Sequence, residues 1–255
     1  MKIPEAMINP SEIANIARAE ESLWWFRGMR AISFALLDPV IPSNGLHRVL
    51  EAGCGTGFFA TALQKRYKTE VVAVDLASEA MRYCRERHAP YLTQASVVSL
   101  PFGDATFDLV ASMDVLPHFA HGEERTAFQE LVRVLRPQGL LLLRAAALNV
   151  FRSRHSKYVW EGQRFTKKRL EALARENGLE ILRLTYANFF LTPVAFLKFR
   201  LYEPLTGRPL ASGIPPIAPL LDHLLYLPLA LERWWLSRGW HFPWGQSLFL
   251  LGRKN

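Results

Sequence analysis

The chain has few cysteines and no long apolar run. Cys54 and Cys84 are its only two cysteines, and Cys54 lies inside a glycine-rich motif, where a disulfide would obstruct a ligand-binding loop. This argues against a disulfide-stabilised scaffold. No uncharged apolar run reaches the roughly 18 residues that a membrane-spanning helix needs, and the amino-terminal segment is too polar for a signal peptide. The sequence therefore predicts a cytoplasmic protein whose contact with a membrane would be peripheral.

Motifs for metal and nucleic-acid binding are also missing. The sequence has no pair of CxxC motifs, no HExxH motif and no regularly spaced cluster of His and Asp. It therefore predicts no metal site. An NPPY-like base-flipping motif and a recognisable RNA-binding domain are absent as well, which argues against nucleic acid as a partner.

Positive charge, in contrast, is concentrated in one part of the chain. Residues 1–147 carry 15 Lys and Arg against 16 Asp and Glu, whereas residues 148–255 carry 16 against 7. A basic patch of this kind suits an anionic partner, although a solvated basic surface would have the same composition.

Strands and helices alternate along most of the chain. Val-rich and Leu-rich runs of strand length fit a sheet buried on both faces, and their alternation with helices indicates right-handed crossovers and parallel pairing. We predict strands at 47–53, 70–77, 94–97, 107–114, 140–146, 179–185 and 246–254. Helices are predicted at 11–37, 58–67, 78–88, 123–135 and 166–177. The fold class is therefore α/β, with a Rossmann-like, mostly parallel seven-stranded sheet that has helices on both faces.

Two segments fall outside this alternation, so the chain divides into four parts. Residues 1–40 form a helical lid, 41–186 the cofactor domain, 187–243 a helical insertion around a Pro/Gly linker, and 244–255 the last strand. The lid carries the cluster Trp24, Trp25 and Phe26, which either contacts a ligand through its aromatic faces or packs on the sheet. Arg27 and Arg30 beside it could meet an anionic group.

A glycine-rich motif follows the first predicted strand. In VLEAGCGTGFFA an apolar strand runs into Glu51 and then Gly53, Gly55 and Gly57, where the backbone turns tightly and a ligand comes close. A carboxylate before these glycines suits the cationic sulfonium and ammonium of S-adenosylmethionine (SAM) better than the pyrophosphate of NAD. Asp75, at the end of the second strand, is placed to accept the ribose hydroxyls, although it could instead only cap a helix.

These motifs, together with SLPFGDATFDLVASMDVLPHF and ELVRVLRPQGLLLL in the same order and spacing, resemble the class I SAM-dependent methyltransferases. The helix ESLWWFRGMR and the terminal PWGQSLFLLGRK are similar to a bacterial subgroup of that class. The resemblance implies SAM as cofactor and S-adenosylhomocysteine as product. It also implies a set of cofactor-binding residues: Glu51, Gly53, Cys54, Gly55, Gly57, Asp75, Leu76, Ser96, Val97, Asp114 and Val115, with Leu100 and Phe102 against the adenine.

The sequence departs from the family pattern at two positions. Ser96 stands where the family usually has an aspartate facing the adenine amine, and Pro117 stands where a glutamate usually precedes His118. A hydroxyl is a weaker acceptor than a carboxylate, so the adenine contact should be looser. Both departures would also suit a SAM-binding regulatory protein that transfers no methyl group.

Methyl transfer requires positioning of the acceptor and removal of its proton. His118, four residues after the fourth strand, is the leading candidate for the general base, and His155 and Tyr158 are the alternatives. Each could instead be a hydrogen-bonded structural residue.

The insertion indicates the acceptor. Its leucines, with Trp234, Trp235, Trp240 and Trp244 among Arg233, Arg238 and His241, have the composition of an interfacial helix. We expect a hydrophobic or lipid-linked small-molecule acceptor and a membrane surface as partner. A homodimer interface would show the same leucines. Nucleic acid or protein is the alternative acceptor.

Overall fold

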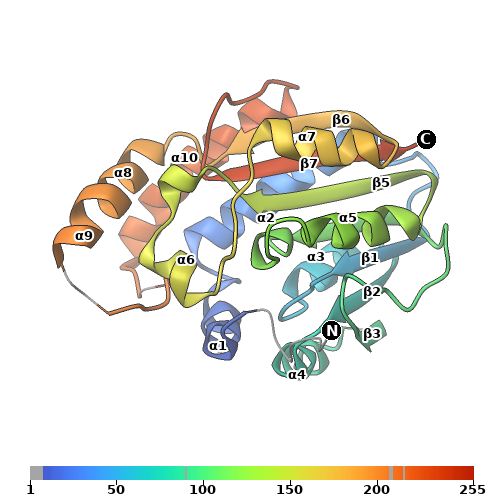
Figure 1. Cartoon of the computed structure of the whole chain (residues 1–255), viewed down its shortest axis with the longest axis horizontal. Helices are drawn as coiled ribbons and strands as arrows, with labels where there is room; N and C mark the ends of the chain where they lie inside the picture. Colours follow the sequence, from blue (N-terminus) through green and yellow to red (C-terminus); the bar gives the residue numbers. More distant parts are fainter. Residues whose placement is uncertain (1–7, 90, 207–208, 215) are drawn as a thin grey trace.

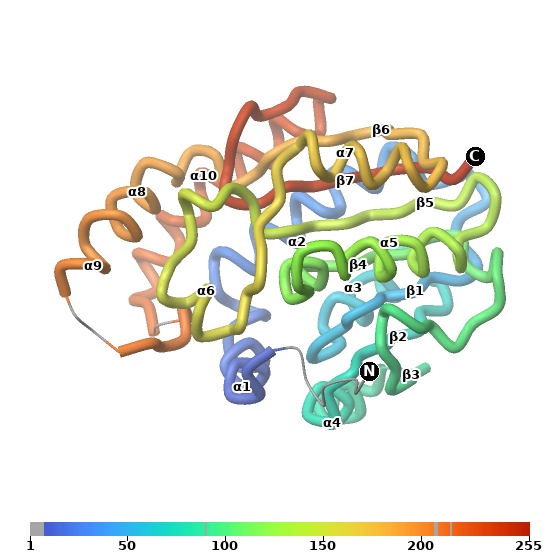
Figure 2. The backbone as a smooth tube through the Cα atoms, viewed as in Figure 1, coloured from blue at the N-terminus to red at the C-terminus, as the bar shows by residue number. Residues whose placement is uncertain are grey.

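The computed structural model describes residues 8–89, 91–206, 209–214 and 216–255; residues 1–7 of the predicted lid, Gly207, Arg208 and Pro215 of the predicted linker lie outside these ranges. At its centre is a seven-stranded sheet with the order β3-β2-β1-β4-β5-β7-β6 (Figures 1 and 2). The strands are β1 (Arg48–Ala52), β2 (Glu70–Asp75), β3 (Tyr91–Gln94), β4 (Phe107–Met113), β5 (Leu135–Ala146), β6 (Leu179–Ala187) and β7 (Ser247–Lys254). β1 to β5 are parallel, and β7 runs antiparallel between β5 and β6. The predicted Rossmann-like α/β fold is confirmed.

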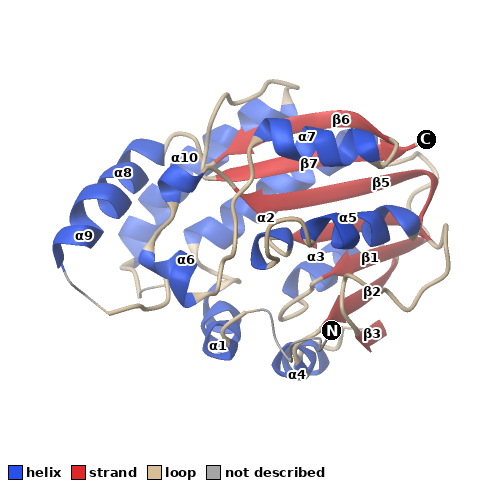
Figure 3. Cartoon of the chain, in the orientation of Figure 1, coloured by secondary structure: helices blue, strands red, loops and turns tan. Residues whose placement is uncertain are grey.

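Helices cover both faces of the sheet (Figure 3). On one face lie α5 (Glu124–Arg133) and α7 (Lys167–Glu176), and on the other α2 (Trp24–Leu37), α3 (Phe58–Tyr67) and α10 (Pro219–Ser237). The central strands are covered on both sides, so Val49, Leu50, Leu109 and Val110 are completely buried. This is why these strands read as continuous apolar runs in the sequence.

The structure corrects two predicted elements. The single helix expected at 11–37 is two helices, α1 (Pro10–Ala19) and α2, because the chain turns at residues 20–23 and the Glu20 side chain bonds elsewhere in the fold. The strand expected at 94–97 lies at Tyr91–Gln94, where it pairs with Val72–Asp75 of β2. This edge strand is only partly buried, and its apolar pattern is correspondingly weak.

The insertion begins after β6 and ends before β7. It contains α8 (Thr192–Leu197), a π-helical turn (Lys198–Tyr202), α9 (Glu203–Thr206) and, after the linker, α10. Ala187 and Ser247 are paired across β6 and β7, so the insertion leaves and rejoins the sheet at one point. The insertion lies with α1 and the short α6 (Arg154–Tyr158) at one end of the sheet (Figure 1).

Candidate functional site

A large cavity lies at the carboxyl ends of the parallel strands, where the strand order reverses between β1 and β4. Open α/β sheets bind ligands at this position. The cavity has a volume of about 1010 Å³ and extends from the glycine loop after β1 to the inner side of the insertion. Ligand clefts span roughly 300 to 1,000 Å³, so this cavity has room for a cofactor and a second molecule.

The glycine loop forms the floor of one end. Gly55 has a φ of 53°, and no atom lies within 4 Å of where its Cβ would be, so its lack of a side chain leaves open space. At Gly53 the reason for glycine is different, because a Cβ there would lie 2.1 Å from a methyl carbon of Val115. The loop therefore combines a close approach to β4 with room for a ligand.

Two carboxylates flank the loop. Glu51 is buried, and its Oε2 has no hydrogen-bond partner among the described residues. Burial raises the pKa of Glu51 well above its usual value, and the nearby Cys84, Glu20 and Asp75 raise it further. Asp75 accepts hydrogen bonds from the amides of Gly55 at 2.8 Å and Ala77 at 2.9 Å, yet burial still raises the pKa of its carboxyl group.

A third carboxylate, which the sequence did not indicate, reaches this end of the cavity from the amino-terminal helices. Glu20 follows α1 and accepts a hydrogen bond from the Thr56 hydroxyl at 2.6 Å. It also forms an ion pair with Arg87 at 2.6 Å. Burial raises the pKa of Glu20 as well. Arg30 of α2 donates to the Glu20 carbonyl, and its guanidinium lies 4.7 Å from the centre of the Phe58 ring. These contacts thus join helices α1 and α2 to the glycine loop.

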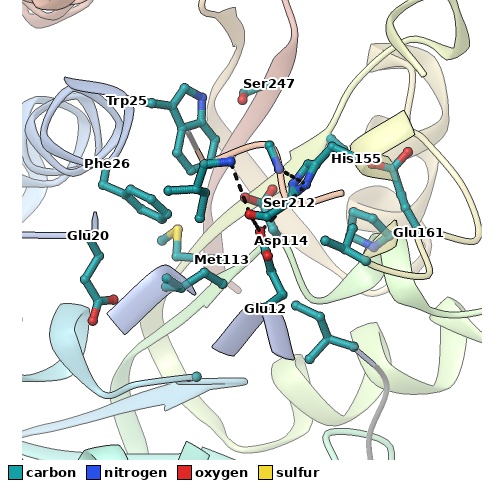
Figure 4. Close-up of a pocket in the computed structure, with 18 of the residues that line it drawn as sticks. Glu12, Glu20, Trp25, Phe26, Met113, Asp114, His155, Glu161, Ser212 and Ser247 are labelled. Carbon is teal, nitrogen blue, oxygen red and sulfur yellow. Dashed lines mark hydrogen bonds and ion pairs between the residues drawn. The ribbon is translucent and has the colours of Figure 1, made fainter. Parts of the chain in front are cut away.

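Aromatic residues of α2 form one wall, as Figure 4 shows. Trp25 and Phe26 lie on the side opposite His155 and Glu161, with Met113 and Asp114 between them. The Arg144 guanidinium lies 4.8 Å from the centre of the Trp25 ring and donates to Asp114 Oδ2 at 2.6 Å. Asp114 therefore lies at the cavity, as predicted, but is already ion-paired with Arg144.

The three candidate bases differ in their surroundings. His118 lines the cavity, and its Nδ1 has no hydrogen-bond partner among the described residues. Burial lowers the pKa of His118, which keeps the imidazole neutral at neutral pH. His155 also lines the cavity, but its Nδ1 accepts a hydrogen bond from the amide of Gly213 at 2.8 Å. Tyr158 is not among the described residues that line the cavity.

Most of the predicted cofactor residues come together here. Besides those named above, Cys54, Leu76, Ser96, Val97 and Val115 line the cavity. The Ser96 hydroxyl already accepts a hydrogen bond from the amide of Val98 at 3.4 Å.

Gly57, Leu100 and Phe102 are not among the described residues that line this cavity. A Cβ at Gly57 would lie 2.8 Å from the Cys84 sulfur, so this glycine serves packing with α4 (Ser78–Glu86). Leu100 is buried in the core, and Phe102 packs edge-on against Phe107.

This end of the cavity fits SAM. A buried carboxylate oxygen without a partner and two further carboxyl groups of raised pKa are complementary to a cationic ligand. Glu51 would face the cationic methionine part, and Asp75 would accept from the ribose. The described residues include no group of three or more His, Cys, Asp or Glu that could hold a metal ion.

Sequence comparisons agree with this geometry. A family model described as a methyltransferase domain matches residues 50–143. The chain is 25% identical to the O-methyltransferase cnsE of Penicillium expansum, over 74% of this chain and 72% of that protein. It is 31% identical to the malonyl-[acyl-carrier protein] O-methyltransferase of Erwinia pyrifoliae over 62% of this chain, and 32% identical to that of Pectobacterium atrosepticum over 46%. The chain spans about half the length of these last two relatives, 59% and 45%.

Structural comparisons show the same fold. A SAM-dependent methyltransferase from Thermotoga maritima superposes with a TM-score of 0.58 at 15% identity, covering 96% of both chains. A geranyl diphosphate methyltransferase superposes with a TM-score of 0.57 at 16% identity, covering 88% of this chain and 76% of that one. Together with the matched domain and the carboxylate-flanked glycine loop, these findings support a class I SAM-dependent methyltransferase with SAM as its cofactor.

Proposed function

We propose that the protein transfers the methyl group of SAM to an O, N or C atom of a hydrophobic or lipid-linked small molecule. The observation that carries this proposal is the composition of the cavity beyond the cofactor end. There the insertion contributes mainly apolar side chains, namely Leu191, Val194, Ala195, Phe199, Ile217 and Leu225. An acceptor with a large apolar part would fill this region by burying its surface there.

Most carboxylates at this end of the cavity have a partner, while Lys198 lines it without an ion-pair partner among the described residues. Asp114 is paired with Arg144, and Glu161 is paired with Arg164 at 2.6 Å. Glu203 accepts a hydrogen bond from the amide of Arg154 at 2.9 Å. Paired charges offer little attraction to a strongly charged acceptor, which supports an apolar or neutral one.

His118 is the proposed general base. SAM supplies a methyl group already activated by its sulfonium, so the chain's own residues have to orient the acceptor and take its proton. His118 lines the cavity, and its buried Nδ1 has no hydrogen-bond partner among the described residues, so the neutral tautomer with its proton on Nε2 would leave Nδ1 able to take a proton. The neutral form of His155 that accepts at Nδ1 carries its proton on Nε2, which suits it to donate a hydrogen bond.

The names of the curated relatives support an oxygen acceptor. They include O-methyltransferases and enzymes named for malonyl-[acyl-carrier protein], a carrier-linked substrate. By analogy, an acceptor held at one end by a carrier or a lipid would place only its reactive end beside His118.

The test is a product assay. Purified protein would be incubated with SAM and either a total lipid extract, a protein extract or total RNA, and S-adenosylhomocysteine would be quantified together with the mass gain of one methyl group in the acceptor. We expect product with the lipid extract, and loss of product in His118→Ala. Product only with RNA or protein would overturn the proposal, and SAM binding without turnover on any extract would indicate a regulatory protein.

A further inference from the structure

The longest helix of the insertion has two apolar faces, and only one of them is covered. On its inner face α10 packs against α2, where Leu229, Glu232 and Leu236 are buried. Its outer face carries apolar side chains at intervals of three or four residues, which is the spacing of one helix face. These side chains are 44 to 72% exposed: Leu220, Leu224, Leu227, Leu231 and Trp234. We call this row the α10 stripe.

A second exposed row runs along the first part of the insertion. It has the same spacing of three or four residues and lies on α8, the π-helical turn and α9. Its side chains are 40 to 86% exposed: Phe190, Leu197, Leu201 and Leu205, with Val194 at the edge where this row meets the cavity. Two exposed apolar rows on one protruding segment are more than the scattered surface leucines of an ordinary soluble protein.

All three carboxylates of the insertion's described residues are turned away from solvent. Asp222 accepts from the amide of Trp24 at 2.7 Å and pairs with Arg27. Glu232 accepts from the backbone amides of residues 188–190, and Glu203 from that of Arg154. The outer surface of the insertion therefore has no acidic group among the described residues.

The basic residues are turned outward. Lys198, Arg200, Arg233 and Arg238 are exposed, and none has an ion-pair partner among the described residues. Arg238 ends α10, and its guanidinium lies 5.3 Å from the centre of the Trp234 ring, which also contacts Trp240 edge-on at 5.8 Å. The apolar rows are thus accompanied by positive charge and by exposed tryptophans.

We infer that the outer face of the insertion docks on an anionic phospholipid membrane. Leucines enter the boundary between headgroups and acyl chains, tryptophans occupy the headgroup level, and lysines and arginines meet the phosphates. No helix among the described residues is long and apolar enough to cross a membrane, so the contact is a surface contact. It deepens the proposed function, because the inner side of the same insertion lines the cavity and a lipid-linked acceptor could pass directly from the membrane.

Charge favours a membrane over a second copy of the chain. In a two-fold dimer the same surface faces itself, so the exposed Lys and Arg would lie near their own copies. Since the acidic groups of the insertion are engaged on its inner side, none would offset this repulsion. An anionic membrane supplies the missing negative charge.

The test compares vesicles of phosphatidylcholine with vesicles that also contain phosphatidylglycerol, by cosedimentation without SAM. We expect the wild type to bind the anionic vesicles at least about tenfold more tightly, and salt to weaken this binding. Leu224→Glu with Leu231→Glu, and separately Lys198→Gln with Arg200→Gln and Arg238→Gln, should each reduce binding by about tenfold or more. Tyr91→Glu is the matched control, because Tyr91 is 52% exposed on the distant edge strand β3.

Circular dichroism and SAM calorimetry establish that each variant is folded. Negligible binding of the wild type to both vesicles would overturn the inference, and so would a lipid-insensitive dimer that Leu224→Glu with Leu231→Glu converts to monomer in light scattering. Methyl transfer without vesicle binding would refute only the membrane surface. Vesicle binding without methyl transfer would refute only the proposed function.

Discussion

The carboxylates at the two ends of the cavity differ in whether they are already ion-paired. At the cofactor end, Glu51 and Asp75 have no Lys or Arg ion-pair partner among the described residues, and burial raises the pKa of both. At the acceptor end, Asp114 and Glu161 are each paired with an arginine. Unpaired buried carboxylates are costly in the empty protein and are relieved by a cationic ligand. Because Glu20 at the first end is already paired with Arg87, Glu51 and Asp75 are the carboxylates left there for a cationic ligand, whereas the carboxylates named at the second end are already paired.

The largest effect should come from removing the proposed base at the acceptor end. We expect His118→Ala to lower turnover by roughly a hundredfold or more, and to leave SAM affinity unchanged, because a base acts on the acceptor. Steady-state kinetics and calorimetry would measure the two quantities. If turnover at saturating acceptor stayed at the wild-type level, His118 would have no role and His155 would take its place.

At the cofactor end, the opposite result is expected for Asp75→Ala. Loss of hydrogen bonds to a charged acceptor should weaken SAM binding by about 1 to 3 kcal/mol, since Asp75 also holds the amide of Gly55 in place. Calorimetry with SAM and with S-adenosylhomocysteine would measure this loss, with His118→Ala as the matched control. Wild-type affinity in Asp75→Ala would remove the ribose contact from the cofactor site.

The pH dependence of SAM binding tests whether Glu51 interacts with the cationic cofactor. Burial raises the pKa of Glu51 in the cofactor-free protein, and a bound cation favours the carboxylate, so SAM binding should release a proton. Affinity should therefore rise with pH below the raised pKa, by up to about tenfold per unit. Calorimetry in buffers of different ionisation enthalpy would count the proton, and Glu51→Gln should abolish its release. Proton uptake by the wild type would contradict this account.

The smallest effect concerns the base of the insertion, where Glu232 joins α10 to the end of β6. Burial raises the pKa of Glu232 to about 7, from an ordinary value of 4.5. The native state then holds this proton longer than the unfolded state, so Glu232 stabilises the fold below pH 4.5 and this contribution is lost as pH rises through 7. Denaturant unfolding should show the loss, at up to about 1.4 kcal/mol per pH unit between these two values, and Glu232→Gln should remove it. An identical slope in both proteins would exclude Glu232 as its source.

The local sequence pattern was enough to predict which residues lie at the cofactor end of the cavity. Glu51 and Asp75 lie at the ends of strands whose apolar runs mark those ends, and parallel strands bring their carboxyl ends to one edge. The same reasoning placed Asp114 and His118 at the cavity. The parallel pairing of β1 to β5 follows from this alternation of strands and helices, whereas the order of the strands was not predicted.

The remainder depends on contacts between distant segments. Residues 20–23, Glu-Glu-Ser-Leu, contain no helix-breaking Pro or Gly, so the break between α1 and α2 is visible only once Glu20 meets Thr56 and Arg87. Glu20 could not be predicted as a cavity residue, because a carboxylate near a helix end is usually solvated. Likewise, His155 loses its free Nδ1 to Gly213, which lies 58 residues further along the chain.

The pairing of Ala187 with Ser247 makes the insertion separable from the sheet. Because its two ends meet, a segment of almost any length could replace it at little cost in loop entropy, without shifting the register of β6 and β7. The cofactor core and the proposed acceptor-binding segment can therefore change independently, as long as the packing of α10 on α2 is kept. A shared fold would then support enzymes with different acceptors. Exchange of the insertion between relatives offers a route to altering the acceptor while SAM binding is kept.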